Sequence, residues 1–90
     1  FNVHVENKIP LSEYAKYTDT MSFCFSKGLG APFGSMLLGK KQIIEKARTM
    51  QIWLGSGYHQ IGYYAGAAKY VLENNILRLN YDNSLAKVLA

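Results

Sequence analysis

The sequence predicts an α/β fold in which a short helix leads into two strands around a turn, and three further helices follow. Three observations support this prediction. Apolar and small polar residues alternate over 20–26, which is the period of a strand with two different faces. A glycine-containing turn and a second apolar run over 33–39 come directly afterwards. Apolar residues at helical spacing then recur over 40–53, 60–74 and 76–90.

One helix is predicted before the first strand, after a segment with an ambiguous pattern. Residues 1–9 alternate only weakly, so that either a short helix or a strand fits them. Residues 10–13 are typical of a helix start, because Ser12 can cap free backbone N–H groups and Glu13 favours the positive end of the helix dipole. We expect this helix to end at residues 18–19.

The first predicted strand has an apolar face and a face of small residues. The glycines after it allow the strand over 33–39 to return antiparallel. Cys24 is the only cysteine, so no disulfide framework or cysteine-based metal site is expected, and its position in an apolar strand indicates a small core residue. The apolar face consists of Met21, Phe23 and Phe25, and the other face of Ser22, Cys24 and Ser26.

The helices that follow differ in the faces they present. The helix over 40–53 is expected to pack through one apolar stripe. The helix over 60–74 has Gly62 and Gly66 among alanines, which favours close packing in a core or at a subunit interface. The last helix has an uneven apolar face. The apolar stripe of the helix over 40–53 consists of Ile43, Ala47, Met50 and Leu54, with Ile44 beside it.

Charge and hydropathy argue against two classes of partner. The formal net charge is +4, and the cationic side chains are scattered among acidic ones without forming a basic stripe, so a nucleic-acid partner is not expected. No apolar run approaches about 18 residues, so no membrane-spanning helix is expected. The single cysteine is compatible with a reducing, cytosolic setting.

Lys27 is the strongest candidate for chemistry, because it stands where the first strand ends. Gly28 and Gly30 remove the side chains next to it, so the backbone can turn sharply and approach a ligand closely. Partial desolvation at this point would favour the neutral amine, which is the nucleophile that Schiff-base chemistry requires. The same residues also fit a solvated lysine in a plain turn.

The segment over 22–35, SFCFSKGLGAPFGS, closely resembles the internal-lysine segment of the low-specificity L-threonine aldolases. These are fold-type I enzymes that use pyridoxal 5'-phosphate. The resemblance continues through residues 10–14, 46–48, 54–55, Gln60 with the alanine-rich run after it, and 78–82, and so covers nearly the whole chain. It implies that residues 1–90 are an internal part of the cofactor-binding major domain, running into the link towards the C-terminal domain. A start at Phe1 instead of a methionine agrees with this expectation.

The resemblance also implies an activity. Lys27 would hold pyridoxal 5'-phosphate through a covalent imine, and the parent enzyme would cleave the Cα–Cβ bond of threonine-like β-hydroxy-amino acids to glycine and an aldehyde. The expected partners are the amino-acid substrate and further copies of the same chain, as a dimer or tetramer in the cytoplasm. The other groups that hold the cofactor and the substrate carboxylate lie outside these residues. We therefore expect the 90-residue chain alone to be inactive.

Two positions depart from the family pattern, one on each side of the glycine residues around Gly55. Where the family has two cations near the cofactor phosphate, this chain has Ile52 and His59. An imidazole offers one charge at most and isoleucine offers none, so phosphate binding should weaken. His59 remains a candidate cofactor-binding residue, and the backbone N–H groups of the loop before a helix start could also hold a phosphate.

Three functions remain open at this stage. The parent protein could be a threonine-aldolase-like lyase, which the retained Lys27 favours. It could be a non-catalytic relative that keeps the fold and the subunit interface, which Ile52 and His59 favour. It could also catalyse another reaction of the same cofactor, such as a β-elimination, because the lysine segment does not determine which bond breaks.

Overall fold

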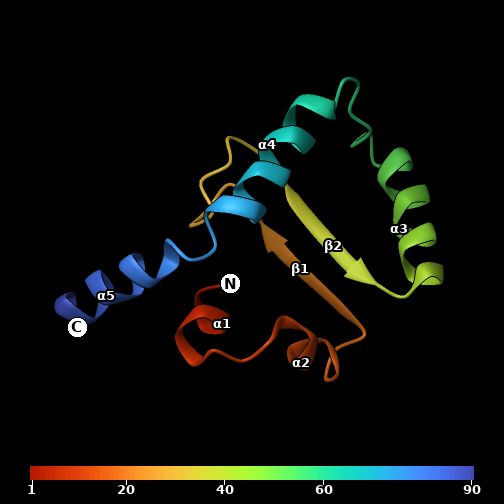
Figure 1. Ribbon diagram of the computed structural model, residues 1–90. Coiled ribbons are helices and arrows are strands. Elements are labelled where there is room, and N and C mark those ends of the chain that lie inside the picture. The colour runs from red at the N-terminus through yellow and green to blue at the C-terminus, as the bar shows by residue number, and fades with distance from the viewer.

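A computed structural model describes all 90 residues, which form five helices and two strands (Figure 1). The predicted α/β order is confirmed, and the ambiguous first segment is a helix. The helices are shorter than predicted by one to three residues at their starts. The elements are α1 (Asn2–Asn7), α2 (Leu11–Ala15), β1 (Thr20–Cys24), β2 (Ser35–Gly39), α3 (Lys41–Trp53), α4 (Gly62–Asn74) and α5 (Leu79–Leu89).

The two strands form an antiparallel hairpin, as the sequence predicts. Thr20 pairs with Gly39 at the open end, and Cys24 pairs with Ser35 next to the turn. The backbone N–H of Phe25 donates to the carbonyl of Gly34 at 2.9 Å, which continues the ladder by one bond. Both strands are shorter than predicted, because the residues between Phe25 and Gly34 hydrogen-bond within their own turn. We call residues 25–34 the Lys27 loop.

The core is small and lies at the turn end of the hairpin, where α1, α4 and α5 approach the Lys27 loop (Figure 1). Phe23 packs against this core through Phe25, with ring centroids 5.1 Å apart, and it also contacts Phe1, with centroids 4.9 Å apart. The alternating burial of β1 confirms the two-faced strand. The buried side chains are Val5, Phe25, Leu29, Ala31, Ala68, Val71 and Leu79.

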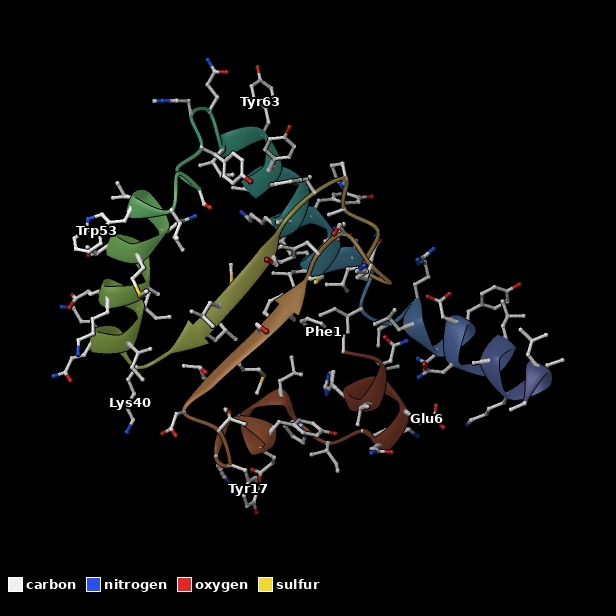
Figure 2. The ribbon with its side chains drawn as sticks, turned by 180° about the vertical axis from the view of Figure 1, so that it is seen from behind. Phe1, Glu6, Tyr17, Lys40, Trp53 and Tyr63 are labelled. Atoms are coloured by element: carbon white, nitrogen blue, oxygen red, sulfur yellow. The ribbon has the colours of Figure 1, made fainter.

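The chain is far more open than an independent domain of its size. Its radius of gyration is 15.1 Å, whereas a compact domain of this length has roughly 12 Å. Its accessible surface is 7343 Å², against about 5300 Å² for a compact monomer of the same mass. Figure 2 shows Trp53 on α3 and Tyr63 on α4 pointing away from the rest of the chain. None of the helices combines the length and hydrophobicity needed to cross a membrane.

Two expectations for single side chains are wrong. Cys24 is exposed, because it lies on the opposite face of β1 from Phe23 and lines an open cavity there. Ser12 makes no capping bond, because α2 already begins at Leu11 and Pro10 occupies the capping position. Proline suits a helix start because it lacks the N–H group that would be left without a partner.

Packing of the later helices is also looser than the sequence predicts. Ile43 and Ile44, near the start of α3, are half-buried against the hairpin, but Met50 is 59% exposed because α3 then runs away from the sheet (Figure 1). A side chain at Gly62 or Gly66 would meet no atom within 4 Å. The close packing expected of these glycines is therefore not made within this chain.

Polar contacts join α1 to α5, which are distant in sequence. Asn2 and Asn83 exchange two hydrogen bonds, from Asn2 Nδ2 at 3.0 Å and from Asn83 Nδ2 at 3.1 Å. Glu6 forms an ion pair with Lys87 and accepts a hydrogen bond from Asn83 at 3.3 Å. The Lys87 ammonium lowers the pKa of Glu6 below its ordinary value of 4.5, with a smaller contribution from Asn83.

This lowered pKa gives the contact between α1 and α5 a pH dependence. Because the folded-state pKa of Glu6 is below the unfolded value, the ion pair stabilises the fold above pH 4.5 and loses this effect as pH falls through the lower folded-state value. We expect Glu6→Gln to lower the urea midpoint at pH 7, with the difference from the unsubstituted protein shrinking as pH falls below 4.5 through the folded-state pKa of Glu6. Salt should reduce the difference, since both groups are solvated. A difference independent of pH would contradict this assignment.

Candidate active site

The Lys27 loop is a closed turn with a defined backbone. The N–H of Gly30 donates to the carbonyl of Lys27 at 2.9 Å, and the N–H of Ala31 donates to the carbonyl of Phe25 at 2.9 Å. Gly30 has φ +81° and Gly34 has φ +106°, which glycine adopts without steric cost. Gly30 and Gly34 are therefore required by the backbone itself.

Buried neighbours hold the loop while Lys27 remains accessible. Phe25, Leu29 and Ala31 are 4%, 2% and 6% exposed, so that one apolar residue precedes the lysine and two follow it in the core. Lys27 itself is exposed. The desolvation expected for this lysine is not provided by these 90 residues. The arrangement presents a primary amine on a loop whose flanking residues are anchored.

Lys27 lines a cavity of about 970 Å³ between the hairpin and α4. The start of β2 and the last turn of α3 complete its walls. Lys69 also lines it, but its Nζ lies 3.9 Å from Glu73, whereas Lys27 has no carboxylate partner. Of the two amines at this cavity, Lys27 is thus the one without an ionic partner.

Aromatic rings and hydroxyl groups make up much of the remaining wall. Phe33 contacts Tyr58 edge to face with centroids 5.4 Å apart, and it contacts Tyr64 at 4.9 Å. Ser26, Ser35 and Ser56 add hydroxyl groups. Such a wall suits a planar ligand that also carries hydrogen-bonding groups, because rings cover its faces while hydroxyls and amines bind its polar atoms.

The second candidate, His59, is not among the residues that line this cavity. His59 is exposed, and Ile52 is 70% exposed on the last turn of α3. Their neighbours Gln51, Ser56 and Tyr58 do reach the cavity wall. The glycine loop therefore borders the cavity, but within this chain His59 and Lys27 are not brought together.

Sequence reasoning missed the contribution of α4 to this wall. One side of α4, together with the residue just before it, faces the cavity. The spacing of apolar residues by three and four positions in the sequence could have indicated this face. The small residues on this side leave room for the cavity. The residues concerned are Ile61, Tyr64, Ala65, Ala68 and Leu72.

A smaller cavity of about 640 Å³ lies beside α2 and the hairpin. Phe1, Met21, Phe23 and Leu38 contribute to its mainly apolar wall. Asp19 and Lys40 are its only charged lining residues. The Lys27 cavity is the better candidate for chemistry, because it is larger and is lined by the lysine that the sequence singles out.

Comparison with known proteins gives a consistent result over the whole chain. The family model for beta-eliminating lyases matches residues 1–90. The chain is 41% identical to low-specificity L-threonine aldolase 1 of Arabidopsis thaliana over 90 residues, which is 100% of this chain and 25% of the relative. It is 39% identical over 90 residues to the low specificity L-threonine aldolase of Escherichia coli strain K12, covering 100% of this chain and 27% of that enzyme.

A fungal relative extends the same pattern. The chain is 36% identical over 87 residues to the low-specificity L-threonine aldolase of Candida albicans, covering 97% of this chain and 23% of the relative. The chain thus spans about a quarter of the length of the curated relatives it matches.

Proposed function

Since this chain belongs to the beta-eliminating lyase family, we propose that it is the lysine-bearing part of a longer pyridoxal-phosphate enzyme that cleaves threonine-like amino acids. The observation that carries this proposal is the position of Lys27, an accessible amine without an ionic partner at a cavity of about 970 Å³. The threonine aldolases that the chain resembles support the choice of substrate.

The residues around Lys27 fit the proposed cofactor. A cavity of about 970 Å³ is large enough for a phosphorylated aromatic aldehyde, since pockets for small ligands range over roughly 300–1,000 Å³. Lys27 would hold the aldehyde carbon through its Nζ. Phe33, Tyr58 and Tyr64 could contact the ring, and the serine hydroxyls around them could donate to its oxygen atoms.

Within this proposal the protein and the cofactor divide the work. When bound, pyridoxal phosphate supplies an electron sink for the bond that breaks at the substrate Cα. Lys27 supplies the covalent attachment, and the Lys27 loop orients that attachment through its bonded backbone. The walls from β2 and α4 limit the positions that a bound amino acid can adopt. These contributions all serve to place the substrate's Cα–Cβ bond for cleavage.

The open structure supports a function within a longer protein. The chain exposes about 2,000 Å² more surface than a compact monomer of its mass, much of it apolar. We propose that the rest of the protein covers part of this surface and that a second copy contributes to the oligomer. Ile52, Trp53 and Leu54, which are 70%, 83% and 76% exposed, are candidates for that contact. The exposed free thiol of Cys24 fits a cytoplasmic location.

The direct test is an assay of the full-length protein that contains this chain. With pyridoxal phosphate present, we expect it to release acetaldehyde and glycine from threonine or allo-threonine. The 90-residue chain assayed in parallel should show no activity. Release of ammonia and a keto acid from serine or cysteine derivatives, without acetaldehyde from threonine, would instead indicate a β-eliminating lyase. Absence of both reactions together with absence of cofactor binding would indicate a relative that has kept the fold and lost the chemistry.

The two departures from the family pattern give a separate expectation. Restoring cations with Ile52→Lys and His59→Arg should lower the Kd of the full-length protein for pyridoxal phosphate by about tenfold, since a charged hydrogen bond to phosphate is stronger than a neutral one. Gln42→Lys on the exposed side of α3 is the control for added charge. The Kd values are measured by equilibrium dialysis. If Gln42→Lys lowers the Kd as much as the substitutions at positions 52 and 59, a specific role of these two positions is excluded.

A further inference from the structure

The Lys27 loop receives two hydrogen bonds from the junction between α4 and α5. The Nδ2 of Asn75 donates to the carbonyl of Leu29 at 2.7 Å, and the Nη2 of Arg78 donates to the carbonyl of Gly28 at 2.9 Å. These are the carbonyl groups of the two residues that directly follow Lys27. The donors are 46 and 50 residues along the chain from their acceptors, so only the tertiary fold brings them together.

The junction also packs against the loop without space between them. Leu79, the first residue of α5, is 0% exposed. A Cβ atom built on Gly28 would lie 2.8 Å from the Leu79 Cδ2, which is closer than carbon atoms approach without a shift. Glycine at position 28 therefore allows the junction to reach the backbone that the hydrogen bonds hold.

The two hydrogen bonds differ in their surroundings. Leu29 is 2% exposed and Asn75 is half-buried, so loss of the Asn75 donor would leave a carbonyl with little access to water. The side chain of Arg78 is 56% exposed and also lies 3.8 Å from Asp82, so water can replace much of its contact. Asn75 should therefore have the larger effect on the loop.

We propose that Asn75 and Arg78 are positioning residues for the Lys27 amine. By holding the carbonyls of Gly28 and Leu29, they restrict the backbone on which Lys27 is carried and keep its amine at the cavity. Neither residue lines the cavity, so their effect is exerted through the loop. The inference rests on the proposed role of Lys27 as the reacting amine. Positioning matters for such a group, because a misplacement of about 1 Å can cost roughly a hundredfold in rate.

The test measures where pyridoxal phosphate attaches to the full-length protein. The protein is incubated with the cofactor for increasing times and reduced with borohydride, and labelled peptides are quantified by mass spectrometry. The remaining lysines of the chain serve as internal references in each sample. Variants are Asn75→Leu, Arg78→Met and Arg78→Lys. Controls are Asn80→Leu and Arg48→Met, which change exposed residues whose side chains form no hydrogen bond.

We expect Asn75→Leu to slow labelling of Lys27 about tenfold and Arg78→Met to slow it about threefold, with other lysines unaffected. Arg78→Lys should recover most of the rate, because its ammonium can still donate to a carbonyl. A second measurement needs no cofactor. The amides of Gly30 and Ala31, which close the loop, should exchange hydrogen faster by similar factors in these variants, while the amides of α3 keep their rates.

The outcomes separate this inference from the proposed function. If Lys27 of the unsubstituted protein is labelled no faster than the other lysines, the proposed function fails and this inference fails with it. If Lys27 is preferred and stays equally preferred in Asn75→Leu and Arg78→Met, only the positioning role is overturned. Faster exchange throughout the chain, including α3, would also overturn it, because the two residues would then act on global stability.

Discussion

Replacing Lys27 with alanine is expected to abolish stable retention of pyridoxal phosphate by the full-length protein and to lower threonine cleavage by a factor on the order of 10³ or more. The reason is chemical, since Lys27 is the amine at the cavity that has no carboxylate partner. The measurement is the visible absorbance of the lysine-bound cofactor after gel filtration, followed by an acetaldehyde assay. Lys46→Ala, an exposed lysine of α3 outside the cavity, should leave both unchanged.

A conservative change separates nucleophilicity from charge at this position. Lys27→Arg keeps the positive charge, but its guanidinium stays protonated and does not form the covalent bond. We therefore expect Lys27→Arg to lose the absorbance band as completely as Lys27→Ala. A band of unchanged intensity in either variant would show that another lysine holds the cofactor.

Replacing Leu79 with alanine is expected to have the largest effect on stability. A fully buried leucine shortened to alanine costs about 2–5 kcal/mol, through lost burial and the cavity left behind. That is a large share of an ordinary free energy of unfolding, about 5–15 kcal/mol. The measurement is the urea midpoint of the full-length protein. Leu77→Ala, with the same change at a side chain that is 77% exposed, should alter the free energy of unfolding by less than about 0.5 kcal/mol.

The close approach of Leu79 to Gly28 makes this expectation more specific. Gly28→Ala alone should destabilise the protein by about 1–3 kcal/mol, since its Cβ would lie 2.8 Å from the Leu79 Cδ2. In the double variant the shortened side chain at position 79 leaves room for the added methyl group. The double variant should therefore lose less free energy of unfolding than the sum of the losses in the two single variants. Strict additivity would contradict the contact between Gly28 and Leu79.

Local patterns were sufficient for the order of elements and for the candidate lysine. Alternation over 20–26 and the glycines after Lys27 predicted the hairpin, because strand period and turn chemistry depend on neighbouring residues. Helical spacing predicted α3, α4 and α5 within a few residues of their ends. Recognition of the family likewise depended on a contiguous segment, the one around Lys27, and the family match over residues 1–90 confirms the family.

Long-range packing decided the points that local patterns left open or misjudged. Alternation gave Cys24 a face of its strand, but only the positions of α3 and α4 show that this face borders an open cavity. Helical spacing gave α3 an apolar stripe, but the direction in which α3 leaves the sheet determines that Met50 stays exposed. In both cases the sequence specifies a face and not the element opposite it.

The sequence by itself therefore determined the hairpin and the helices after it, and it singled out Lys27 as the candidate amine, because these depend on residues that are close together in the chain. Only the tertiary structure decided what holds that amine in place. Asn75 and Arg78 contact the Lys27 loop across 46 and 50 residues of chain. No periodicity relates positions so far apart, because such contacts form only when the separate elements pack against one another.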